Sequence, residues 1–290
     1  MTERNDMNPT ERSLKNPKPT VGAASADASD VWQVGDVELT SRFLLGTAGY
    51  PSPQVLAESI AVSHTQIVTV GLKRTLAAQG DNGFIAIIQN ALKQGQARLL
   101  PNTAGCRSAR EAIQLAHMAR ELYDTPWLKL EVVGDEHTLQ PDPFELVSAA
   151  EQLVRDGFTV FPYCTDDLVT CRRLLDVGCP LLMPWGAPIG SGQGLLNPFA
   201  LRTLRERLPD TTLIIDAGIG APSHAAQAME MGFDAVLLNS AVSQARTPVA
   251  MAQAFGAAIA AGRMAYLAGV MPAQDFAVAS TPVGGAPLLL

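Results

Sequence analysis

A lysine and a glutamate alternate with apolar residues in the segment Trp127-Leu-Lys-Leu-Glu131. Successive side chains of a strand point to opposite faces, so a strand here places Lys129 and Glu131 on one face, roughly 6–7 Å apart. Burial disfavours the ammonium form and lowers the pKa of a lysine, and a neutral amine attacks a ketone to form a Schiff base. The pattern therefore predicts either a Schiff-base lysine or a structural ion pair between Lys129 and Glu131.

A second carboxylate, Asp216, directly follows the apolar run of residues 211–215. At the end of a buried strand a carboxylate contributes little to packing, whereas it suits a general acid or base. The alternative is that Asp216 caps the helix expected from Ser223 onward. We take Asp216 as the candidate proton-transfer group.

Three loops, each following an apolar run, have backbone amides that suit an anionic group. They contain Gly190, Ala217 with Gly218, and Asn239 with Ser240. Glycines let backbone N–H groups approach a ligand closely, and the start of a helix adds positive potential. Together the three loops predict a phosphorylated substrate.

These candidates fall at the ends of eight short apolar runs, which alternate with helical periodicity. The runs cover residues 42–46, 66–70, 98–101, 127–133, 159–163, 180–184, 211–215 and 234–238, and we expect helices at 108–122, 143–155, 168–177, 198–208 and 223–231. The alternation predicts an α/β protein, a single (β/α)8 TIM barrel whose chemistry lies at the C-terminal ends of its strands. An open doubly wound sheet is the alternative, but Gly46-Thr-Ala-Gly49 is a poor match to its glycine-rich turn.

The chain of 290 residues is longer than the barrel needs. We expect a disordered tail at residues 1–30, which are rich in Asn, Pro, Ser and Thr. The barrel domain is predicted at residues 31–270. A C-terminal tail rich in Pro, Gly and Ala is predicted at residues 271–290.

Composition narrows the classes of function. The net charge is −7, so general binding to nucleic acid or to an anionic membrane is not expected. No run reaches the ~18 apolar residues of a membrane span, and the N-terminus lacks the apolar region of a secretory signal, which favours a cytoplasmic location. The four cysteines and four histidines do not have the spacing of metal ligands, so we expect no metal and no cofactor.

Six longer motifs occur in one order along the chain. They are Leu100-Pro-Asn-Thr-Ala-Gly105, Trp127-Leu-Lys-Leu-Glu131, Met183-Pro-Trp-Gly-Ala-Pro-Ile-Gly-Ser191, Ile215-Asp-Ala-Gly-Ile-Gly220, Pro222-Ser-His-Ala-Ala226 and Ala235-Val-Leu-Leu-Asn-Ser240. Together they resemble bacterial thiazole synthases, the family that builds the thiazole ring of thiamine. The resemblance extends from about Phe43 to Pro282.

The resemblance implies a barrel that acts on 1-deoxy-D-xylulose 5-phosphate. Lys129 matches the family's strand lysine, which forms an imine with the sugar ketone, and Glu131 and Asp216 match its acid and base carboxylates. The residues that match its substrate contacts are Gly190, Ala217, Gly218, Asn239 and Ser240. Sulfur arrives on a carrier protein with a C-terminal thiocarboxylate, and dehydroglycine comes from a separate enzyme. The family forms homo-oligomers, so we expect a dimer or a tetramer.

One loop departs from the family pattern, which commonly reads Gly-Thr-Gly-Lys-Tyr. This chain has Gly46-Thr-Ala-Gly-Tyr50, so a lysine at the rim is missing. Two other interpretations stay open. Another Schiff-base barrel for sugar phosphates, aldolase-like (class I) or pyridoxal-phosphate-forming, would need no thiocarboxylate. A non-catalytic scaffold for the sulfur carrier would have a damaged site, yet Lys129, Glu131 and Asp216 are in place.

Overall fold

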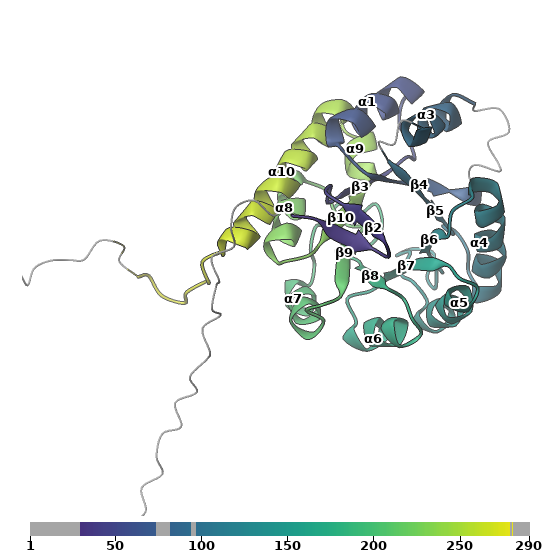
Figure 1. The fold of residues 1–290 in the computed structure, drawn as a ribbon. Coiled ribbons are helices and arrows are strands. Elements are labelled where there is room, and N and C mark those ends of the chain that lie inside the picture. Colours follow the sequence, from purple (N-terminus) through teal and green to yellow (C-terminus); the bar gives the residue numbers. More distant parts are fainter. Residues whose placement is uncertain (1–29, 74–81, 94–96, 279, 281–290) are drawn as a thin grey trace, which may run out of the picture. The chain divides into compact units, whose positions relative to one another are not determined.

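The centre of the protein is a closed barrel of eight parallel strands (Figure 1). The computed structural model describes residues 30–73, 82–93, 97–278 and 280, so the predicted N-terminal tail lies outside the described residues except for its last residue. The strands, in the order in which they pair, are β3 (Phe43–Gly46), β4 (Ile67–Gly71), β5 (Arg98–Asn102), β6 (Trp127–Leu130), β7 (Thr159–Cys164), β8 (Leu181–Pro184), β9 (Thr212–Asp216) and β10 (Ala235–Leu238), which closes on β3. The prediction of a (β/α)8 barrel is confirmed.

Helices surround the strands on the outside of the barrel (Figure 1). They are α1 (Pro53–Ser63), α3 (Asn82–Lys93), α4 (Ala109–Tyr123), α5 (Pro143–Arg155), α6 (Leu168–Asp176), α7 (Pro198–Arg207), α8 (Pro222–Glu230), α9 (Ser240–Ser243) and α10 (Pro248–Ala268). The five predicted helices are α4 to α8. In α4 to α7 a polar side chain at the N-cap accepts a hydrogen bond from a first-turn N–H, namely Ser108, Asp142, Asp167 and Asn197. Such caps satisfy N–H groups that have no partner within the helix.

Strand β6 ends at Leu130, earlier than the apolar run to residue 133 predicts. The backbone N–H of Glu131 donates to Thr103 Oγ1 at 2.8 Å, so a side chain takes the place of the next ladder bond. The N–H of Val133 donates to Cys106 O at 2.8 Å. The chain therefore leaves the barrel at Glu131, one of the candidate catalytic residues.

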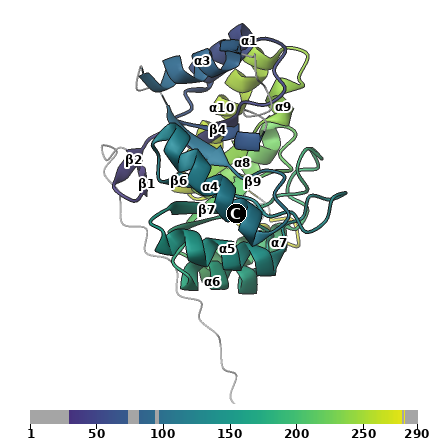
Figure 2. The same cartoon turned by 90° about the vertical axis from the view of Figure 1, so that its right-hand side faces the viewer.

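A hairpin that the sequence analysis did not predict packs against the apolar residues inside the barrel. It consists of β1 (Trp32–Val34) and β2 (Val37–Leu39), and Figure 2 shows it at the left-hand edge of the molecule. Trp32, Val34 and Leu39 join the lumen cluster, which includes residues from the first positions of several strands. The hairpin therefore closes the N-terminal end of the barrel and leaves the C-terminal end for the site.

The longest helix, α10, packs against α1 and α8 on the outside of the barrel (Figure 1). Its sequence is rich in alanine and apolar on nearly every side, so it lacks the polar–apolar period that reveals a surface helix. That explains why sequence periodicity did not predict it. Among the described residues, no helix combines the length and the hydropathy that crossing a membrane requires.

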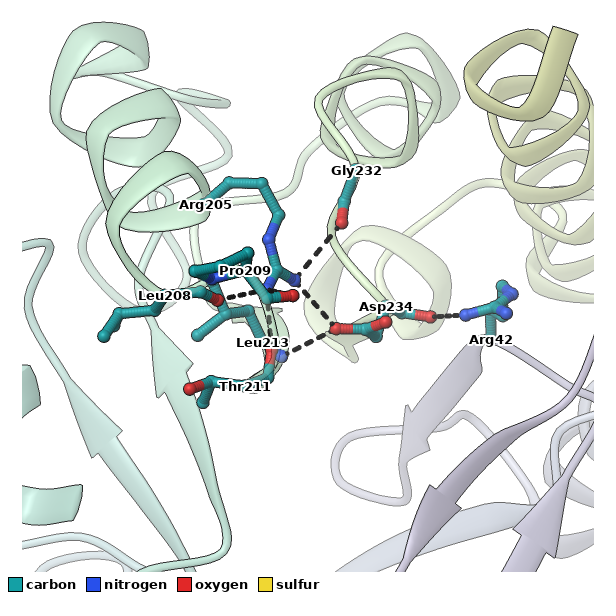
Figure 3. A network of polar contacts seen from close by, with 8 residues as sticks. All are labelled: Arg42, Arg205, Leu208, Pro209, Thr211, Leu213, Gly232 and Asp234. Carbon is teal, nitrogen blue, oxygen red and sulfur yellow. Dashed lines mark hydrogen bonds and ion pairs between the residues drawn. The ribbon is translucent and has the colours of Figure 1, made fainter. Parts of the chain in front are cut away.

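A polar network ties α7 to β9 and β10 at the N-terminal ends of these strands (Figure 3). Arg205 pairs with Asp234 Oδ2 at 3.1 Å, and this oxygen also accepts the N–H of Leu213 at 2.9 Å. Arg205 further donates to the carbonyls of Leu208, Pro209, Thr211 and Gly232. Because this is the end opposite to the expected chemistry, the network serves stability.

Candidate active site

Lys129 points into the barrel lumen and is clamped between two carboxylates. Its Nζ lies 2.7 Å from Asp216 Oδ2 and 3.0 Å from Glu131 Oε1. The three residues are buried, with exposed fractions of 5% for Lys129 and Glu131 and 2% for Asp216. The ion pair between Lys129 and Glu131 therefore exists, but it is part of a triad that includes a carboxylate from β9.

The triad holds Lys129 in its charged form. Burial is the largest single influence on the pKa of Lys129 and favours the neutral amine, but the charges of Asp216 and Glu131 and their hydrogen bonds outweigh it together. The pKa of Lys129 is therefore raised above its ordinary value. Burial alone would favour the neutral amine, but in the free protein the two carboxylates compensate the buried charge and favour the ammonium form.

Asp216 is the group placed to take the lysine proton. Burial raises the pKa of Asp216 to about 6, even though the charge of Lys129 opposes the rise. The alternative role as a helix cap is wrong, because the N-cap of α8 is Ala221 and no side chain caps that helix. A carboxylate with a pKa near neutrality, in contact with an ammonium, suits a general acid or base.

The triad opens into a cavity of about 740 Å³ at the C-terminal ends of the strands. All eight residues singled out from the sequence line this cavity: Lys129, Glu131, Asp216, Gly190, Ala217, Gly218, Asn239 and Ser240. They come from β6 and the residue that follows it, from β9, from the loops after β8 and β9, and from the junction of β10 with α9. Lys73, which follows β4, also lines the cavity.

The loop after Asp216 is locked against the loop after β8. Ala217 and Gly218 have φ angles of +68° and +77°, and a Cβ on Gly218 would lie 2.3 Å from Ala187 N. Gly218 O also accepts the N–H of Gly194 at 2.8 Å. A glycine is therefore required at position 218, and the backbone of this wall of the cavity is fixed before any ligand arrives.

Asn239 lines the same cavity and has an unused acceptor. Its Nδ2 donates to Ala48 O at 3.0 Å, whereas its buried Oδ1 has no hydrogen-bond partner in the described part of the chain. Gly46 gives it room, since a Cβ there would lie 2.5 Å from Asn239 Cβ. The free amide oxygen suits a hydroxyl of a bound ligand.

Thr103 fixes the backbone that carries the triad, a role that the sequence analysis did not assign to it. Its fully buried Oγ1 donates to Glu131 O and accepts from Glu131 N, both at 2.8 Å, and its own N–H donates to Lys129 O at 3.1 Å. The only sequence signal was its place after an apolar run. The ring centre of Tyr163 lies 5.5 Å from Lys129 Nζ.

The fold and the site together define a class of proteins. These are parallel (β/α)8 barrels in which a buried lysine lies between two carboxylates and faces a cavity lined by glycine-containing loops. Residues 33–282 match the family model of the thiazole biosynthesis protein ThiG. The chain therefore belongs to the ThiG family, a family of enzymes of thiazole biosynthesis.

Known relatives agree with this assignment. The chain is 55% identical over 260 residues to a thiazole synthase of Coxiella burnetii, covering 90% of this chain and 99% of the relative. It is 58% identical to a thiazole synthase of Ralstonia pickettii, covering 89% and 94%. Among solved structures, a chain of the Amycolatopsis orientalis BexX/CysO complex matches with a TM-score of 0.74 at 30% identity, over 84% of this chain and 98% of that chain.

Proposed function

We propose that this enzyme forms the thiazole phosphate of thiamine from 1-deoxy-D-xylulose 5-phosphate, dehydroglycine and sulfur from a thiocarboxylated carrier protein. The observation that supports this proposal best is the Lys129 nitrogen, held between two carboxylates at the inner end of a large open cavity. An amine in that position is placed to attack a ketone. Membership of the ThiG family supplies the reaction to which such an imine belongs.

The first step is imine formation at Lys129. Asp216, which lies 2.7 Å away and has a pKa of about 6, accepts a proton from the ammonium, and the neutral amine attacks the C2 ketone. Two protons pass from nitrogen to the former carbonyl oxygen, which leaves as water, and the iminium keeps the positive charge. The carboxylates stabilise that charge as they stabilise the ammonium.

The iminium acidifies the proton on C3, and Glu131 or Asp216 removes it, which moves the carbonyl to C3. The thiocarboxylate sulfur attacks this carbon, and dehydroglycine supplies nitrogen and carbon for ring closure. Water and the carrier's carboxylate leave in later steps. Each proton transfer contributes typically ~10²–10⁴-fold to the rate.

The glycine loops hold the phosphate end of the sugar in this proposal. Backbone groups of Gly190, Ala217 and Gly218 and the Asn239-Ser240 segment line the same cavity as Lys129. The backbone at Gly218 is fixed against the loop after β8, so this part of the wall binds the phosphate without reorganisation.

Sulfur reaches the cavity on a protein partner. The matching solved structure is a complex between two proteins, BexX and CysO, which supports a protein partner for the present chain. A cavity of about 740 Å³ has room for a carrier tail beside a sugar phosphate. A separate enzyme supplies dehydroglycine, and the functional form is a homo-oligomer.

The imine is tested by reduction with borohydride in the presence of the sugar phosphate, followed by peptide mass spectrometry. We expect the reduced sugar on Lys129, no adduct in Lys129→Ala, and an unchanged adduct in Lys93→Ala, which removes an exposed lysine of α3. A fully active Lys129→Ala protein would end the proposal. Turnover that needs no thiocarboxylate would instead favour an aldolase-like or pyridoxal-phosphate-forming barrel.

A further inference from the structure

Lys73 is a second lysine in the wall of the cavity. Gly71, the last residue of β4, pairs with Asn102 of β5, and Asn102 pairs with Lys129 of β6. Lys73 therefore follows two residues after the level of Lys129 and belongs to the rim at the C-terminal ends of the strands. Among the described residues that line the cavity, Lys73 and Lys129 are the only ones with a positively charged side chain.

The two ammonium groups differ in how their charge is compensated. Lys129 Nζ touches two carboxylates, whereas Lys73 Nζ donates to the neutral carbonyl of Gly105 at 2.8 Å and lies 3.8 Å from Glu111 Oε2. The exposed fractions of the Lys73 and Glu111 side chains are 44% and 51%, and an ion pair exposed to this degree is weak. The neighbouring Cys106 thiol is neutral, because burial raises its pKa. A ligand carboxylate can therefore compete for the Lys73 charge.

Lys73 lies across the mouth of the barrel from the glycine loops. In the closed order of strands, β4 is four strands away from β8 in either direction. The loop after β8 contains Gly190, and the loop after the next strand, β9, contains Ala217 and Gly218. In the proposed function these loops hold the phosphate of the sugar. The Lys73 ammonium is therefore placed for a different anionic group from the one that these loops bind.

The charge of the triad shows where that second anion is favoured. Two carboxylates around one ammonium leave the triad with a net negative charge above the pKa of Asp216, which is about 6. A ligand carboxylate is repelled from the triad and attracted by a cation at the rim. Dehydroglycine is a small α-imino carboxylate, and its carbon and nitrogen must reach the sugar on Lys129. Its carboxylate is then best directed away from the triad.

We infer that Lys73 binds the carboxylate of dehydroglycine at the rim, while the imino end of this substrate points toward the sugar on Lys129. A hydrogen bond between an ammonium and a carboxylate is among the strong ones, and dehydroglycine has few other groups by which a protein can hold it. The carrier protein, in contrast, has a whole surface for its binding. The inference rests on the proposed function and assigns a site to its second small substrate.

The test measures the KM of each of the three substrates separately, with the full chain. Dehydroglycine is supplied as glyoxylate with a fixed excess of ammonium, and the formation of thiazole is followed. The variants are Lys73→Ala, which removes the charge, and Lys73→Arg, which keeps it. Lys93→Ala is the matched control, because it removes the charge of an exposed lysine of α3. Reductive trapping of the sugar phosphate on Lys129 is measured in parallel.

We expect Lys73→Ala to raise the KM of dehydroglycine about 10-fold or more, and to leave the KM of the sugar phosphate and the rate of its adduct within about 2-fold. Lys73→Arg should bring the KM of dehydroglycine back to within about 3-fold of the wild type, because the positive charge is retained. Lys93→Ala should behave as the wild type. The melting temperature of Lys73→Ala should change little, since Gly105 is exposed and water replaces the lost donor.

Other outcomes overturn the inference. If Lys73 only links two loops, Lys73→Ala raises all three KM values together. A rise confined to the carrier protein would assign Lys73 to the thiocarboxylate, and an unchanged KM of dehydroglycine would leave Lys73 without a role in binding it. If the wild type fails to form the sugar adduct or the thiazole, the proposed function itself fails. An active wild type with an unaffected Lys73→Ala variant refutes this inference alone.

Discussion

The Lys129 nitrogen and the Asp216 carboxylate lie 2.7 Å apart, although they belong to β6 and β9, which do not pair with each other. Closure of the barrel brings them together across the lumen. Proton transfer between them therefore needs no movement of the backbone. The charge state of this pair governs the first three predictions, the fourth concerns the backbone of Glu131, and the fifth concerns the opposite end of the barrel.

Removing the lysine should destabilise the protein in a pH-dependent way. Lys129→Ala leaves two buried carboxylates without their cation, and breaking a buried ion pair in this manner costs about 3–5 kcal/mol. The loss should be largest above pH 7 and shrink toward pH 5, because Asp216, whose pKa burial already raises to about 6, then takes up a proton. Urea unfolding at several pH values measures it. The double variant Lys129→Ala with Asp216→Asn should recover part of the loss at high pH, and no recovery would contradict the argument.

Imine formation should depend on the ionisation of Asp216. Below its pKa of about 6 the carboxyl is protonated and cannot accept the lysine proton, so the rate should rise from pH 5 to pH 7 with a midpoint near 6. Trapping with cyanoborohydride follows this rate across the range. The substrate phosphate also ionises at a pKa of about 6. The Asp216→Asn variant separates the two, since only an inflection caused by Asp216 disappears in it.

Substitution of the two carboxylates should impair different steps of the reaction. We expect Asp216→Asn to slow imine formation by about 10²–10⁴-fold, because it removes the proton acceptor in contact with Lys129. Glu131→Gln should still form the imine but lose proton removal at C3. Deuterium uptake at C3 of the bound sugar in heavy water measures that step. Equal losses in both variants at both steps would show that the carboxylates act as one unit.

Thr103 should act on the site through the backbone of Glu131. Thr103→Val keeps the shape but leaves the N–H and C=O of Glu131 unpaired, which should cost about 1–3 kcal/mol and lower the adduct rate about 10-fold. Thr103→Ser retains the hydroxyl and should restore both. A serine variant as impaired as the valine variant would show that the hydroxyl is not what maintains the stability and the rate.

The Arg205 network should affect stability alone. Arg205→Ala removes hydrogen bonds to four carbonyls and the ion-pair partner of Asp234. We expect the free energy of unfolding to fall by about 2 kcal/mol or more. Partial exposure of the Arg205–Asp234 pair keeps the contribution of the ion pair itself small. Arg202→Ala, an exposed position on the same helix, should have little effect. The adduct rate per folded molecule should be unchanged in both variants, because the network lies at the other end of the barrel from Lys129. A slower rate in Arg205→Ala would show coupling between the two ends.

The strands and most helices could be predicted from local patterns in the sequence. Apolar runs at regular spacing indicated the eight strands, and the alternation around Lys129 placed it on one face with Glu131. These are short-range properties, because the geometry of a strand depends on adjacent residues. The β1–β2 hairpin was missed because its strands have three residues each, and α10 was missed because its apolar residues have no period.

The site itself was decided by the tertiary structure. The sequence identified Lys129 and Asp216 as separate candidates, but only barrel closure determines that they touch, and that contact reverses the charge state expected from burial alone. The contacts of Thr103 with Glu131 and of Tyr163 with Lys129 have the same origin. Electrostatic interactions depend on distance through space, and separation along the chain carries no information about that distance until the strands are paired.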